Sequence, residues 1–107
     1  AAIYQRTGKP VIFTEIGFRS VRGTSLRPWE WSHSADVVDL KAQKACYEAV
    51  FSTFWSQPWL HGMYWWKWFS DLDRGGKRNG GFTPQGKPAE KVLSHWYSKE
   101  RPRGKAQ

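Results

Sequence analysis

Two short apolar runs, each followed by a loop and an amphipathic helical pattern, constrain the fold of this chain more than any other feature. The first run, residues 11–14, consists of strand formers and is apolar on both faces. The second run, residues 62–69, is rich in aromatic side chains. The order strand, loop, helix, strand, loop, helix predicts an α/β fold with a parallel sheet and a right-handed crossover. Because two parallel strands leave a face uncovered, we expect a larger sheet.

Apolar periodicity predicts the helices between and after these strands. Ser34 is a candidate N-cap for the first helix. Its expected apolar stripe comprises Val38, Ala42, Ala45, Cys46 and Ala49, widened by Val50 and Phe54. The last helix begins at about Pro88, with a stripe of Ala89, Val92, Leu93, Trp96 and Tyr97. Residues 1–7 are expected to end another helix, and the chain divides into a domain portion over 1–98 and a basic, disordered tail over 99–107.

Charge and cysteine content limit the classes of partner. The chain of 107 residues has a formal net charge of +8, a balance that suits nucleic acid or anionic surfaces. Much of this charge lies in the tail and in one Gly-rich loop that holds Arg74, Lys77 and Arg78, which favours solvated ends over a binding patch. We expect neither a nucleic-acid partner nor a membrane one, since no apolar run is long enough to cross a bilayer. The single cysteine, Cys46, excludes an internal disulfide.

Glu15 is the clearest catalytic candidate. It follows the first apolar strand at its C-terminal edge, where α/β barrels carry their catalytic residues. Gly17, two residues later, gives the backbone freedom to turn or to let a ligand approach. A salt bridge at the strand end, to Arg19 or Lys67, is the alternative, and position alone leaves the two interpretations open.

Tryptophan is the second functional signal. The chain has eight, more than an ordinary core of this size needs, and a flat indole stacks well on the apolar face of a sugar ring. By strand alternation, Trp66 and Trp68 share a face with Tyr64. Trp29 and Trp31 lie in the loop above the same edge. For the remaining four, core packing is the preferred interpretation: Trp55, Trp59, Trp65 and Trp96.

Metal and other catalytic chemistries find little support. Asp71 and Asp73 precede glycines, but basic residues interrupt the segment and Phe82 stands where a calcium loop needs an acid. The three histidines show no metal-ligand spacing, and no serine lies in a nucleophile elbow. We expect no metal and no cofactor.

Three segments together resemble a known enzyme family. Residues 9–20, Lys-Pro-Val-Ile-Phe-Thr-Glu-Ile-Gly-Phe-Arg-Ser, are similar to the seventh strand of clan A glycoside hydrolases, and residues 64–68, Tyr-Trp-Trp-Lys-Trp, to their eighth. Residues 82–89, Phe-Thr-Pro-Gln-Gly-Lys-Pro-Ala, resemble the lead into their last helix. The set most resembles glycoside hydrolase family 113, whose known members are β-mannanases. The implied fold is a partial (β/α)₈ TIM barrel, its last two βα units, strands 7 and 8 with their helices.

This resemblance implies a retaining endo-β-glycosidase that hydrolyses β-linked polysaccharide, with mannan expected as substrate. Glu15 is then the nucleophile, and the acid/base Glu belongs to a fourth strand that this chain lacks. Trp68 is the first choice for the sugar platform and Trp66 the second. The other implied sugar contacts are Trp29, Trp31 and Arg19.

The expected dependence on absent barrel strands has two consequences. The chain alone is expected to be inactive, and its uncovered strand faces are expected to promote self-association. A non-catalytic carbohydrate-binding module is the main alternative, and a nucleic-acid protein with stacking aromatics is another. The sequence leaves the compartment open, cytoplasmic or secreted.

Overall fold

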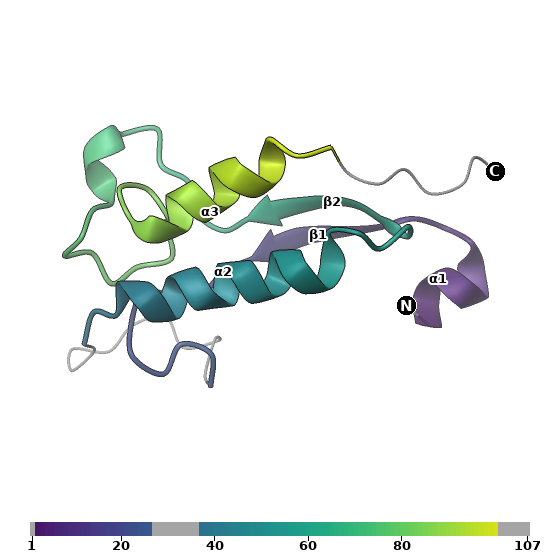
Figure 1. Ribbon diagram of the computed structural model, residues 1–107, viewed down its shortest axis with the longest axis horizontal. Helices are drawn as coiled ribbons and strands as arrows, with labels where there is room; N and C mark the ends of the chain where they lie inside the picture. The colour runs from purple at the N-terminus through teal and green to yellow at the C-terminus, as the bar shows by residue number, and fades with distance from the viewer. Residues whose placement is uncertain (1, 27–36, 101–107) are drawn as a thin grey trace.

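The computed structural model describes residues 2–26 and 37–100. Its elements are helix α1 (Ala2–Thr7), strand β1 (Val11–Ile16), helix α2 (Leu40–Phe54), strand β2 (Leu60–Trp65), the short 3₁₀ helix η1 (Leu72–Arg74) and helix α3 (Pro88–Tyr97). The two strands run in the same direction, α2 and α3 contact each other beside them, and the loops that follow the strands gather at the end of the molecule opposite α1 (Figure 1). The predicted helix at residues 1–7 and the parallel α/β order are confirmed.

The two strands pair in a register that shifts twice. Val11 pairs with Leu60 and Ile12 with Gly62, so β2 has one extra residue at this point. Further on, Phe13 pairs with Met63 and Ile16 with Trp65, so the extra residue now lies in β1. The second shift falls at Glu15 and determines the direction of its side chain.

An aromatic core fills the space between the sheet and the two long helices. Its buried members are Tyr47, Phe51, Trp55, Leu60, Met63, Ala89 and Val92. The ring of Phe51 stacks on Trp96 with centroids 5.5 Å apart, and Tyr47 stacks on Trp65 at 3.9 Å. The partly buried Trp59 packs edge-on against Phe13. The packing role predicted for Trp55, Trp59, Trp65 and Trp96 is confirmed.

Helix α2 begins later than the sequence predicted. Its N-cap is Asp39, whose Oδ1 accepts a hydrogen bond from the Ala42 N–H at 3.0 Å. Val38 lies outside the helix, because it forms an isolated antiparallel bridge with Val21 of the preceding loop. The predicted cap, Ser34, lies outside the described residues.

The buried face of α2 also differs from the predicted stripe. Gln43, Cys46, Tyr47 and Phe51 are its buried residues, whereas Ala45 and Ala49 are exposed. The helix is rotated from the expected orientation because burying two large aromatic rings removes far more apolar surface from water than burying two methyl groups. The expected burial of Cys46 is confirmed.

The opposite face of the sheet is uncovered. Ile12 is 51% exposed and Tyr64 is 64% exposed. The third helix, α3, begins at Pro88 as predicted and buries Ala89 and Val92 against the core. Among the described residues, no helix is long and apolar enough to cross a membrane, and no cluster of three or more His, Cys, Asp or Glu could hold a metal ion.

Candidate active site

Glu15 lies in the irregular end of β1. Phe13 and Ile16 both pack against the aromatic core, and the two residues between them, Thr14 and Glu15, are both exposed. Regular alternation would turn Glu15 to the same side as Phe13. The extra residue of β1 turns the carboxylate away from the core instead, and bulges often redirect side chains next to active sites.

Two aromatic side chains close tightly around the backbone after Glu15. The Trp66 N–H donates a hydrogen bond to the Ile16 carbonyl at 2.6 Å, so the strands remain connected up to this point. A Cβ on Gly17 would lie 3.0 Å from Cδ1 of Phe82 and 3.2 Å from Cβ of Trp66. Gly17 therefore lets the Phe82 ring and the Trp66 Cβ pack closely against the backbone two residues after Glu15, where a larger side chain would push them away.

A cavity of about 420 Å³ is lined by residues of the loop between β2 and α3. We refer to it as the loop cavity. It is lined by Trp66, Lys67, Phe69, Arg74, Asn79, Gly81, Phe82 and Thr83. Its volume suits a small ligand, and its wall combines flat rings with hydrogen-bond donors.

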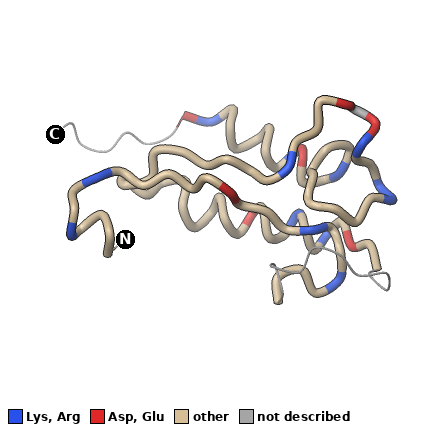
Figure 2. The backbone as a smooth tube through the Cα atoms, turned by 180° about the vertical axis from the view of Figure 1, so that it is seen from behind, with Lys and Arg blue, Asp and Glu red and all other residues tan. Residues whose placement is uncertain are grey.

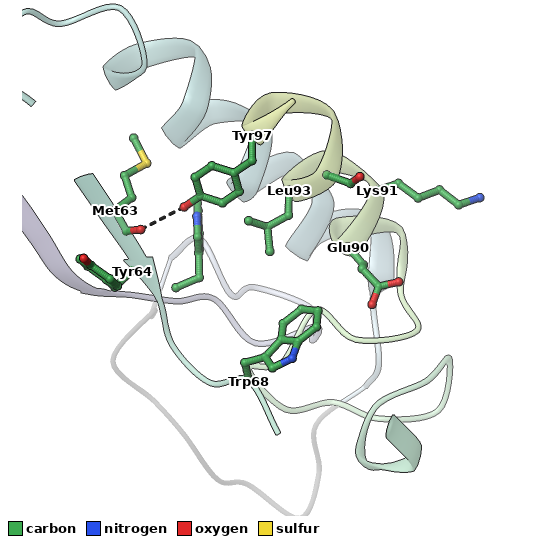
Figure 3. A pocket seen from close by; sticks show the side chains of 9 residues that line it. Met63, Tyr64, Trp68, Glu90, Lys91, Leu93 and Tyr97 are labelled. Atoms are coloured by element: carbon green, nitrogen blue, oxygen red, sulfur yellow. Dashed lines mark hydrogen bonds between the residues drawn. The ribbon is translucent and has the colours of Figure 1, made fainter. Parts of the chain in front are cut away.

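Trp68 points to a different cavity, so its predicted shared face with Trp66 is wrong. Alternation applies only within a strand, and β2 ends at Trp65, so alternation does not extend to Trp66 and Trp68. Trp68 lines a cavity of about 630 Å³ between β2 and α3, which we call the edge cavity (Figure 3). There the Tyr97 hydroxyl donates to the Met63 carbonyl at 3.0 Å. The edge cavity lies along the side of β2 that has no neighbouring strand.

Two buried glutamines hold the loops at the strand ends. Gln43 Nε2 donates to the carbonyls of Phe18 at 3.0 Å and Phe82 at 3.1 Å. Gln85 accepts from the Phe69 N–H at 2.8 Å and donates to the Phe69 carbonyl at 2.9 Å. Sequence reasoning missed both residues, although Gln43 stands three and four residues before two core residues of α2 and could have been recognised as a buried polar position.

Lys87 is the third residue of this buried network that the sequence did not reveal. It is 4% exposed, and its Nζ donates to Ser20 Oγ and Asn79 Oδ1, both at 3.0 Å, and to the Gly81 carbonyl at 3.1 Å. Burial, with a smaller effect from the Arg19 charge, lowers the pKa of Lys87 to about 8. Lys87 thereby links the loop after β1 to the loop after β2.

The remaining predicted site residues are placed as follows. Arg19 is only 9% exposed, and a Cβ on Gly80 would lie 4.0 Å from its Nη2. Its predicted sugar contact stays a prediction. Trp29 and Trp31 lie outside the described residues.

The family of this chain follows from a comparison with protein-family descriptions, in which Glycoside Hydrolase Family 113 matches residues 1–87. The chain belongs to glycoside hydrolase family 113. A comparison with curated protein sequences found no significant match.

Solved structures of family 113 enzymes share the fold of this chain. One described as a complex of a GH113 β-1,4-mannanase is 27% identical, with a TM-score of 0.82, and the match covers 92% of this chain and 32% of the other. The β-mannanase AaManA from Alicyclobacillus acidocaldarius, in complex with ManMIm, is 29% identical, with a TM-score of 0.78 and coverages of 91% and 32%. A further GH113 β-1,4-mannanase is 28% identical, with a TM-score of 0.81, and the match covers 92% of this chain and 32% of the other.

The family 113 chain thus spans about a third of the length of these relatives. Its parallel strand pair with two packed helices corresponds to part of a barrel. In this part of the barrel, one face of the sheet is uncovered, and the edge cavity lies beside β2. Family membership favours a glycoside hydrolase fragment over the nucleic-acid protein and the binding module considered as alternatives.

Proposed function

We propose that this chain supplies the nucleophile-bearing last two βα units of a retaining β-1,4-mannanase barrel. The observation that carries the proposal is the exposed carboxylate of Glu15 at the bulged end of β1, beside Gly17 and Trp66. Strand ends of this kind are where α/β barrels carry catalytic groups. Support comes also from relatives described as β-1,4-mannanases.

In the proposed reaction, a carboxylate oxygen of Glu15 attacks the anomeric carbon while the glycosidic C–O bond breaks. A second carboxylic acid protonates the departing oxygen, and the same group then removes a proton from the water that hydrolyses the glycosyl ester. Retention requires the two carboxyl groups to lie about 5–5.5 Å apart. The second group would come from the part of the barrel that this chain does not span, and the isolated chain would be inactive.

Trp66 is the better candidate for the sugar platform. The sequence put Trp68 first, but Trp68 lines the edge cavity with Tyr64, on the side of β2 away from β1. The Trp66 N–H instead donates to the Ile16 carbonyl, and Trp66 packs against Gly17, so it contacts the two residues that follow Glu15. An indole at this position would stack under the sugar ring whose bond is cleaved.

The test uses the product of the complete open reading frame that contains these residues. Reducing-sugar release from β-mannan is compared for the wild type, Glu15→Gln and the exposed control Glu100→Gln. We expect Glu15→Gln to lower kcat by several orders of magnitude and Glu100→Gln to leave it unchanged, and an activated 2-fluoro mannoside to esterify Glu15 in a mass spectrum. Full activity of Glu15→Gln, or a label on another carboxylate, would contradict the proposal.

A further inference from the structure

Two cationic side chains line the loop cavity, each beside an aromatic ring. Lys67 Nζ lies 5.5 Å from the centre of the Trp66 ring, and the Arg74 guanidinium carbon lies 4.5 Å from the centre of the Phe69 ring. Attraction between a cation and the negative face of a ring limits how far each head group moves. Both side chains are solvent-exposed, and each lies against a ring at the cavity wall.

A third cation lies directly behind the cavity wall. Lys87 donates to Asn79 and Gly81, which both line the cavity, and all three of its acceptors are neutral oxygens. With a pKa of about 8, its amine is mostly protonated at neutral pH. A buried positive charge paired only with neutral dipoles is felt strongly by groups nearby, because little water screens it.

The described residues that line the cavity include no Asp and no Glu. One acid of the same loop, Asp71, caps η1, since its Oδ1 accepts a hydrogen bond from the Asp73 N–H at 2.9 Å. Lys and Arg recur along the loops beyond the strand ends, as Figure 2 shows. The cavity wall therefore carries an excess of positive charge together with flat aromatic rings.

We infer that the loop cavity binds an acidic sugar unit, a pyranose ring that carries a carboxylate, in the polysaccharide that the proposed hydrolase cleaves. The ring of Phe82 offers apolar surface to the pyranose, while Lys67 and Arg74 pair with its carboxylate. Because Trp66 also lines the cavity, the acidic unit lies next to the sugar proposed to stack on Trp66. This inference rests on the proposed function and adds an acidic sugar unit to the chains that the proposed mannanase binds.

A matched pair of probes tests the inference on the Glu15→Gln product of the complete open reading frame, which binds without cleaving. The β-1,4-linked mannose trimer and the β-1,4-linked mannuronate trimer differ only in the carboxylate at C6. Calorimetric titration at pH 6.5 and low salt compares their affinities. We expect the mannuronate trimer to bind on the order of tenfold more tightly, and this preference to shrink at 0.5 M salt.

Two double variants locate the origin of the preference. Replacing Lys67 and Arg74 with Gln is expected to make the two trimers bind almost equally. Replacing Lys77 and Arg78 with Gln removes the same charge from the same loop but from outside the cavity, and is expected to keep most of the preference. Equal binding of the trimers to the parent protein, or equal loss of preference in both double variants, would overturn the inference. Cleavage of neutral mannan that depends on Glu15 would leave the proposed function standing in that case.

Discussion

Lys87→Met tests how the buried amine that links the two loops affects stability. The pKa of Lys87 is lowered from 10.5 to about 8 in the folded chain, first by loss of solvent and second by the Arg19 charge. Between these two pH values, the unfolded chain still binds a proton that the folded chain has released. The free energy of unfolding therefore rises as the pH rises through this window.

The size of this effect follows from the two pKa values. Each unit of difference corresponds to 1.36 kcal/mol, so lowering the pKa from 10.5 to about 8 gives a gain of at most about 3 kcal/mol. The acceptors of Lys87 keep other partners after substitution, since Gly81 N also donates to Asn79 Oδ1 and Ser20 N to the Gly81 carbonyl. We therefore expect Lys87→Met to fold, and to lose the pH-dependent gain.

Urea unfolding followed by tryptophan fluorescence from pH 7.5 to 10.5 measures this gain. Burial raises the pKa of Cys46, Tyr47 and Tyr97, so their contributions to stability fall as the pH rises. Because these groups are present in both proteins, the difference between wild type and Lys87→Met isolates the lysine. We expect this difference to shift in favour of the wild type as the pH rises. A difference that stays constant over the window would refute the reasoning.

Three further predictions concern packing and association. Phe51→Ala, at a fully buried position of the aromatic core, should lower the free energy of unfolding by about 3–5 kcal/mol in urea titrations, and a change below about 1 kcal/mol would contradict the described core. Gly75→Ala places a Cβ against the Gln85 carbonyl oxygen, and should lower the free energy of unfolding by about 1–3 kcal/mol in the same assay. An unchanged free energy would show that the two backbone segments do not lie so close together. Tyr64→Lys, on the uncovered sheet face, should reduce self-association in sedimentation velocity; an unchanged distribution of species would show that this face is not the one that associates.

The sequence predicted the parts of the fold that depend on local pattern. The strand over residues 11–14 and the helix from Pro88 each combine an apolar period with an end signal, and the structure contains both. The predicted start of α2 was wrong because Val38 pairs with Val21 instead of joining the helix. A bridge between residues so far apart in the chain leaves no local trace in the sequence.

The candidate site was predictable only in part for a similar reason. The sequence made Glu15 a catalytic candidate because a carboxylate after an apolar strand is unusual, and that role stays a prediction. Lys87 was missed because an isolated lysine is usually solvated, and its burial depends on Ser20, which lies 67 positions away. The rotation of α2 was missed because alanines and aromatic residues both count as apolar, whereas their sizes decide which of them the core receives.

The bulge in β1 places Glu15 directly before the second of two residues that anchor the strand to the core. Phe13 and Ile16 anchor the strand to the aromatic core on either side of two outward residues. Deleting Thr14 would restore plain alternation and leave Glu15 as the single residue between the two anchors, so its carboxylate would still point away from the helices. In related sequences, a glutamate directly before the second anchor is therefore more informative than the number of residues between the two anchors.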